Sequence, residues 1–185
     1  MSTATATLRV LSPEGELAAP DPVAPAPGLD DLHARHVAFL SNTKPNIDLL
    51  LQTYADLLKE RYEVSATQRR KMNAAVGAGV LIDELAGNSQ AVVTGIADCG
   101  ACTAQTARDA VSFEARGVPT VLVTTTAFES LARYQAQYSG ASRVRMLVLP
   151  HPFDTLRPEE VVEQAKSSID QIVALLKDGA GRDVA

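Results

Sequence analysis

Four apolar runs of strand length, each followed by a segment with helical periodicity, dominate this 185-residue chain. They span residues 36–42, 91–96, 120–125 and 145–150. Continuous apolar runs of this length are typical of strands buried on both faces of a parallel sheet. The alternation therefore predicts an α/β fold: a three-layer Rossmann-like or flavodoxin-like sandwich with a mostly parallel sheet of about four to five strands. The order of the strands stays open.

The helices expected around these strands begin or end at recognisable signals. Pro45 and Pro158 suit the first turn of a helix, and Gly87, Gly117 and Gly140 suit its end. The expected helices span residues 44–62, 72–85, 103–116, 127–140 and 157–179.

The length suits one well-filled α/β domain, which we place at residues 32–179. Residues 1–31 are expected to be a tail and a linker, since 17–31 is rich in Pro and Ala and has no hydrophobic period. Within it, residues 8–16 fit either a short edge strand or turn, or a disordered tail. Residues 180–185 are expected to be a C-terminal tail.

Composition and charge exclude several classes of function. The net charge is -5, and the basic cluster Arg69-Arg70-Lys71 is expected on a solvated face, so we expect no nucleic-acid partner. No secretory signal and no apolar run of about 20 residues is present, so we expect no membrane partner. Two cysteines cannot staple a secreted scaffold, and this predicts a cytoplasmic protein.

Polar or reactive groups follow every expected strand. In open parallel sheets the ligand crevice lies outside the carboxyl ends of the strands, so these groups are the site candidates. They are Ser41, Asn42, Thr43 and Lys44; Asp98, Cys99, Gly100, Ala101, Cys102 and Thr103; Thr124, Thr125 and Thr126; and Pro150, His151 and Pro152.

Cys99 and Cys102 form a CxxC motif where a strand meets a helix. A helix N-terminus lowers the pKa of a thiol, and the spacing lets one cysteine attack while the other resolves a disulfide. Asp98 is either the cap of the helix or a base. The alternative for both cysteines is burial as small apolar residues.

The remaining candidates are assigned to catalysis or metal binding, and to substrate binding. His151 is interpreted as an acid–base group or, with Cys99 and Cys102, as a ligand of zinc or another transition metal. A loop histidine without a role is the alternative. Lys44 and Asn42 suit a substrate carboxylate or carbonyl, or are ordinary polar residues at a helix start. Further substrate-binding candidates are Thr43, Gly100, Thr103, Thr124 and Thr125.

Residues 97–132, "ADCGACTAQTARDAVSFEARGVPTVLVTTTAFESLA", with "VLPHPF" at 148–153, resemble the UGSC-like family. That family is related to selenoprotein B of the glycine, sarcosine and betaine reductases. The resemblance runs from about His36 to the last helix and leaves the Pro/Ala-rich segment outside. The family's selenocysteine-Gly-Ser-Cys motif corresponds to Cys99-Gly100-Ala101-Cys102, with Cys in place of selenocysteine and Ala in place of Ser.

The resemblance implies a reactive chalcogen at Cys99 and a partner thiol at Cys102. In the reductases, a selenol attacks carbon and displaces a nitrogen leaving group within a multi-subunit complex. We expect a thiol-dependent oxidoreductase or lyase that acts on a small carboxylate-bearing metabolite and needs an external thiol reductant. One alternative is a metal-dependent hydratase or hydrolase. Another is a non-catalytic or thiol-carrier subunit. A homo-oligomer or a heteromeric partner subunit is compatible with each.

Overall fold

A six-stranded sheet forms the centre of the protein, whose computed structural model describes residues 20–141, 143–178 and 182–183. Residues 8–16 therefore lie outside the described residues. The strands are β1 (His36–Ser41), β2 (Ser65–Arg70), β3 (Ala91–Ala97), β4 (Thr120–Thr125), β5 (Arg143–Leu149) and β6 (Arg182–Asp183).

The strand order is β2-β1-β3-β4-β5-β6. The first five strands are parallel, and the two-residue β6 pairs antiparallel with β5. The order 2-1-3-4-5 is flavodoxin-like, and its winding reverses between β1 and β3. Ligands of such sheets bind outside the carboxyl ends of the strands at this reversal, so the order directs attention to the loops after β1 and β3.

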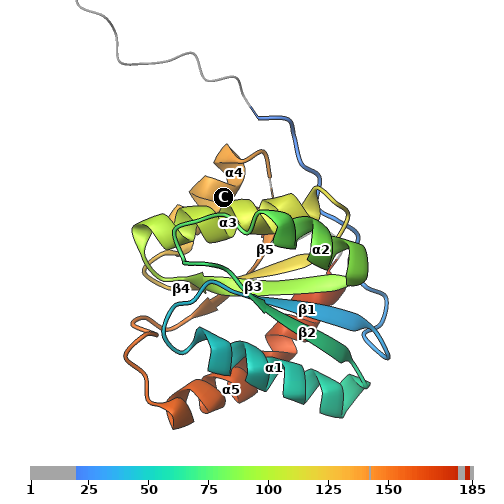
Figure 1. Ribbon diagram of the computed structural model, residues 1–185, viewed down its shortest axis with the longest axis vertical. Coiled ribbons are helices and arrows are strands. Elements are labelled where there is room, and N and C mark those ends of the chain that lie inside the picture. The colour runs from blue at the N-terminus through green and yellow to red at the C-terminus, as the bar shows by residue number, and fades with distance from the viewer. Residues whose placement is uncertain (1–19, 142, 179–181, 184–185) are drawn as a thin grey trace, which may run out of the picture.

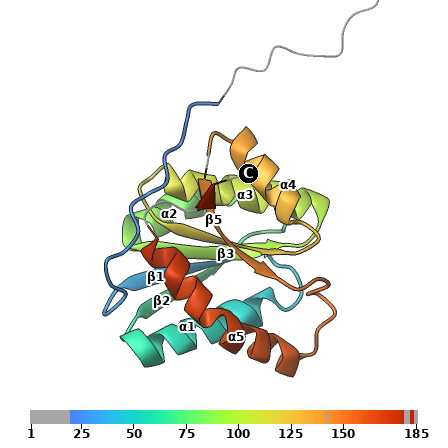
Figure 2. The same ribbon diagram turned by 180° about the vertical axis from the view of Figure 1, so that it is seen from behind.

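Helices cover both faces of the sheet, as Figures 1 and 2 show. α1 (Ile47–Tyr62) and α5 (Pro158–Lys177) lie on one face. α2 (Val80–Asn88), α3 (Gly100–Glu114) and α4 (Glu129–Tyr138) lie on the other. The expected three-layer α/β sandwich is confirmed. None of these helices is long and apolar enough to cross a membrane.

The four apolar runs form β1, β3, β4 and β5, and their residues are almost all buried. Helices α1 and α5 bury their apolar faces against one side of these strands. The largest core cluster includes Phe39, Leu50, Tyr54, Val93, Val123, Leu147, Ile169 and Ile172. Burial on both faces explains why these strands read as continuous apolar runs.

Strand β2 was not predicted from the sequence. Its residues SATQRR are polar and half-buried or exposed, because β2 lies at the edge of the sheet. The expected helix 72–85 is also wrong, since the helix begins at Val80 and extends to Asn88. The residues before it form a loop that ends at Gly79, whose φ of 55° is incompatible with a right-handed helix.

A buried ion pair holds this loop on α3. Lys71 Nζ lies 2.5 Å from Asp109 Oδ2, and the backbone N–H of Ala78 donates to Asp109 Oδ1 at 3.0 Å. The expectation that Lys71 belongs to a solvated basic cluster is therefore wrong, since its side chain is almost fully buried. Arg69 and Arg70 are exposed.

The Pro/Ala-rich segment lies against the domain from residue 20 onward. The N–H of Ala26 donates to Glu114 Oε2 at 2.6 Å, while its carbonyl accepts from Arg145 Nη2 at 2.5 Å. Arg145 Nη1 also donates to Glu114 Oε1 at 2.6 Å, and Arg145 is almost fully buried. One buried ion pair thus anchors an extended segment to β5 and α3.

Candidate functional site

The loops after β1, β3, β4 and β5 meet at the carboxyl edge of the sheet. Lys44 Nζ, after β1, lies 3.2 Å from Asp98 Oδ1, after β3. Thr125 Oγ1, at the end of β4, lies 3.1 Å from His151 Nδ1, after β5. The charge of His151 also acts to lower the pKa of Asp98. The structure therefore brings together candidates from all four predicted positions.

The two cysteines form the N-terminus of α3. Cys99 is the residue that caps the helix, and Cys102 is its third residue. The N–H of Cys99 donates to Cys102 Sγ at 3.0 Å, and the N–H of Cys102 donates to Cys99 Sγ at 3.4 Å. The two sulfur atoms are paired at disulfide distance, with 5.5 Å between the Cα atoms. Each sulfur thus accepts from an otherwise unpaired N–H of the first turn.

The two sulfurs differ in access. Cys102 is fully buried, whereas Cys99 is half-buried beside the exposed Gly100 and Ala101. A Cβ added at Gly100 would meet no heavy atom within 4 Å outside its chain neighbours and the nearby backbone of its own helix, so the space beside Gly100 is open. Only Cys99 can therefore be approached from solvent.

Asp98 lies beneath this pair and contacts the buried cysteine. Cys102 Sγ is 3.4 Å from Asp98 Oδ1, close enough for a thiol to donate to the carboxylate. Burial raises the pKa of Asp98, and the hydrogen bond and charge of Lys44 oppose that rise. Asp98 is therefore a carboxyl group that can exchange a proton with Cys102 while Lys44 supports its ionised form.

Asn42 is fully buried and holds strand β3 in place. Its amide nitrogen donates to the carbonyl of Ile96 at 2.8 Å and to Thr106 Oγ1 at 3.1 Å. Its amide oxygen accepts from the N–H of Ile96 at 3.0 Å. Because these bonds occupy the side chain, we correct the expected substrate-binding role of Asn42 to a positioning role. It ties the end of β1 to β3 and α3 just before the cysteines.

Three of the four threonines predicted to bind substrate are also buried. Thr124 Oγ1 donates to the carbonyl of Ala97 at 2.8 Å, and Thr103 is fully buried. Neither reaches solvent, so the structure does not support direct contact with a substrate. Thr125 is buried as well, and its hydroxyl contacts His151. Thr43 is half-buried on the β1–α1 loop, next to Lys44.

Among the described residues, two of the three expected metal ligands, Cys99 and Cys102, lie in a group able to hold a metal, but His151 does not. Ligand atoms of Asp98, Cys99 and Cys102 all lie within 4.8 Å of one another, and His151 is not a member of this cluster. His151 is exposed instead, with Nδ1 against Thr125 and its ring 5.7 Å from that of Phe128. Its predicted place as the third ligand is taken by Asp98.

Sequence reasoning missed two residues of this edge. Asp154 adds a negative charge that raises the pKa of Asp98, and Phe128 packs edge-on against His151. Asp154 follows the fourth strand closely enough that the same rule on strand ends could have found it. Nothing in the sequence distinguishes Phe128 from an ordinary core residue.

The fold and this site define a flavodoxin-like α/β protein with a cysteine pair at a helix N-terminus. The model of the UGSC family matches residues 9–178, and the chain belongs to that family. The match includes residues 9–35, which the sequence resemblance had left outside. No curated protein matches the chain.

Proposed function

We propose that the protein is a thiol-dependent enzyme of oxidoreductase or lyase type that acts on a small carboxylate-bearing metabolite. The observation that carries this proposal is the asymmetry of the pair. Cys99 is accessible and accepts an N–H at the helix N-terminus, while Cys102 is buried against a carboxyl group. Such an arrangement suits one attacking and one resolving thiol.

In the first step the Cys99 thiolate attacks an electrophilic carbon of the substrate. A carbon–sulfur bond forms, the bond to the leaving group breaks, and His151 donates a proton to that group. The open space beside Gly100 admits the substrate. Lys44, which is one-fifth exposed, attracts its carboxylate.

In the second step Cys102 resolves the adduct. Asp98 accepts the proton of the Cys102 thiol, and the resulting thiolate attacks the sulfur of Cys99. A disulfide forms while the carbon–sulfur bond breaks, and the carbon takes its electron pair and a proton. The substrate is thereby reduced by two electrons, and an external dithiol restores both thiols by disulfide exchange.

A second candidate is supported by the cluster of Asp98, Cys99 and Cys102. Two thiolates and one carboxylate fit zinc, which in catalytic sites has three protein ligands and one open position. Bound there, zinc would supply Lewis-acid activation of water for hydration or hydrolysis. Lys44 would then have to leave Asp98, because its ammonium occupies the same carboxylate.

The decisive experiment is alkylation of the reduced protein across a pH series, with each cysteine followed by mass spectrometry. We expect Cys99 to react at a pH well below the ordinary thiol pKa of about 8.5, and to be protected once oxidised to Cys102. Cys102→Ser should keep the reactive Cys99, whereas Cys99→Ser should leave a poorly reactive Cys102.

Other outcomes would contradict this mechanism. Protection of both cysteines in the reduced protein until a chelator is added would favour the metal site. Reaction of both only on unfolding would show two buried residues without a chemical role. Turnover that appears only with a second chain would identify a subunit or thiol carrier.

A further inference from the structure

The outer edge of β2 is left open in the part of the chain that the structure describes. β2 ends the sheet on one side, whereas β6 pairs with the start of β5 on the other. The N–H groups of Ser65 and Lys71 donate to carbonyls of the β1 side. The N–H and C=O groups of successive residues point to opposite sides of a strand. Those of Ala66, Gln68 and Arg70 therefore point to the open side of β2, away from β1.

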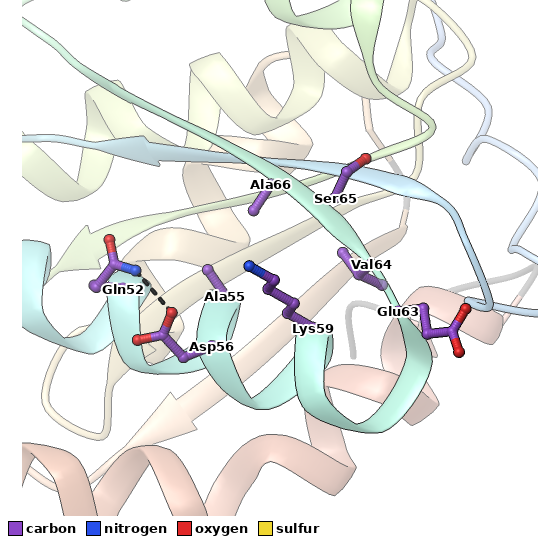
Figure 3. A pocket seen from close by; sticks show the side chains of 8 residues that line it. All are labelled: Gln52, Ala55, Asp56, Lys59, Glu63, Val64, Ser65 and Ala66. Carbon is purple, nitrogen blue, oxygen red and sulfur yellow. Dashed lines mark hydrogen bonds between the residues drawn. The ribbon is translucent and has the colours of Figure 1, made fainter.

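Two hollows flank this edge, one on each face of the sheet. The larger, of about 580 Å³, lies between β2 and α1 and is shown in Figure 3. Its lining residues are Gln52, Ala55, Asp56, Lys59, Glu63, Val64, Ser65 and Ala66. The smaller, of about 350 Å³, lies between β2 and α2 and includes Thr67, Arg69 and Glu84. The edge thus offers room on both faces for the side chains of an added strand.

The size and charge of the side chains along β2 indicate which kind of strand can pair with its open edge. The first half carries the short side chains Ser65, Ala66 and Thr67, and the second half carries Arg69 and Arg70. The acidic residues Asp56 and Glu63 line the hollow beside the first half. A strand running antiparallel to β2 fits if it places arginine against the short residues and the acids. β2 of a second copy has this pattern.

We infer that the protein forms a two-fold symmetric dimer through β2, which joins two sheets into one. A two-fold axis perpendicular to the sheet keeps the faces aligned and makes the pairing isologous. With Gln68 opposite Gln68 of the second copy, Ala66 stands opposite Arg70, and their outward backbone groups pair. Arg70, which is mostly exposed and 3.2 Å from Asp48 in one copy, then enters the acidic hollow of the other.

Lys59 is the one basic residue lining that hollow in the described chain. Its amine reaches across the hollow in Figure 3, and the residue is exposed. In the dimer its flexible stem turns to solvent as the arginine of the second copy enters. Asp56, which accepts from Gln52, and Glu63, which lies 3.5 Å from His33, both remain, so an entering cation meets two carboxylates.

The test is sedimentation equilibrium of the full chain and of two variants of Gln68, with circular dichroism as the check on folding. Gln68→Pro removes one outward N–H without removing a bond to β1, and proline is tolerated at such an edge position. We expect the unaltered chain to be a dimer and Gln68→Pro a folded monomer. Gln68→Ala keeps the N–H and should remain a dimer.

A charge exchange tests the same interface without a backbone change. Arg70→Glu should raise the dissociation constant at least about tenfold, because it places a carboxylate beside Asp56 and Glu63 of the other copy. Adding Glu63→Arg to that variant should restore the dimer. A chain that is monomeric at all concentrations, or a dimer indifferent to both Gln68→Pro and Arg70→Glu, would overturn the inference.

Discussion

At the scale of single residues, the two cysteines are chemically unequal although their sequence context is nearly symmetric. Cys99 is half-buried next to the exposed Gly100, while Cys102 is buried and contacts the carboxyl group of Asp98. Burial disfavours the charged form of Asp98, and the hydrogen bond and charge of Lys44 offset this most strongly. The site therefore combines one accessible sulfur with a buried acid–base pair.

Asp98 gives a pH-dependent prediction. Because burial raises the pKa of Asp98, the folded protein holds this proton more tightly than the unfolded chain does. The stabilisation from this proton is full below the unfolded pKa of about 3.9 and is lost as pH rises through the higher folded value. Asp98→Asn should therefore raise the melting temperature near neutral pH, with the gain shrinking in acid.

The measurement is thermal unfolding of the oxidised protein over a pH series, with Asp154→Asn as the control. Asp154 is exposed, so its replacement should change the melting temperature little. The proposed mechanism adds that Asp98→Asn slows disulfide formation by Cys102. A lower melting temperature of Asp98→Asn at neutral pH would show that its bond with Lys44 outweighs the cost of burial.

At the scale of elements, the position of α3 depends on a few polar side chains beneath its first turns. Asn42 links the ends of β1 and β3 to Thr106 of α3. Asp109, two turns from the cysteines, receives Lys71 and the N–H of Ala78 from the β2–α2 loop. The helix that presents Cys99 is thus fixed by neighbours on both sides.

Asn42→Ala should destabilise the fold because it leaves the N–H and carbonyl of Ile96 buried without partners. Each such group costs about 1–3 kcal/mol, so we expect a loss of at least about 2 kcal/mol in urea unfolding. The alkylation rate of Cys99 should change as well, since the end of β3 is no longer tied. Asn88→Ala, at an exposed helix position, should cost less than about 0.5 kcal/mol. Equal losses in the two variants would contradict this role of Asn42.

At the scale of the whole molecule, the described residues before β1 contact the domain, and the family model includes them in its match to residues 9–178. Ala26 is buried and exchanges hydrogen bonds with Glu114 and Arg145. A buried guanidinium that loses an acceptor is costly, because little solvent reaches it to replace the bond. The segment therefore contributes to stability from the edge opposite the cysteines.

Truncation tests this contribution. A chain that starts at Pro20 keeps every described contact. A chain that starts at Leu29 loses Ala26, so Glu114 Oε2 loses a donor and Arg145 Nη2 loses an acceptor. We expect the shorter chain to be less stable than the longer by at least about 2 kcal/mol in urea unfolding. Equal stability of the two chains would show that water replaces Ala26 without cost.

The sequence by itself determined the layers of the fold and the edge that carries the site. Strands buried on both faces must be continuously apolar, so β1, β3, β4 and β5 were visible, and the polar ends of parallel strands must meet at one edge. The edge strand β2 was not visible, because a strand that meets solvent needs no apolar run. Periodicity alone could not show that Gly79 delays the start of α2.

Tertiary structure alone decided which side chains act together. Both cysteines follow the same strand, yet only packing buries Cys102 against Asp98 and leaves Cys99 open. Packing also turned Asn42 inward and put Asp98 in the place expected for His151. Burial and hydrogen bonding depend on contacts between distant segments, and these set the chemistry of a side chain once the residue types are given.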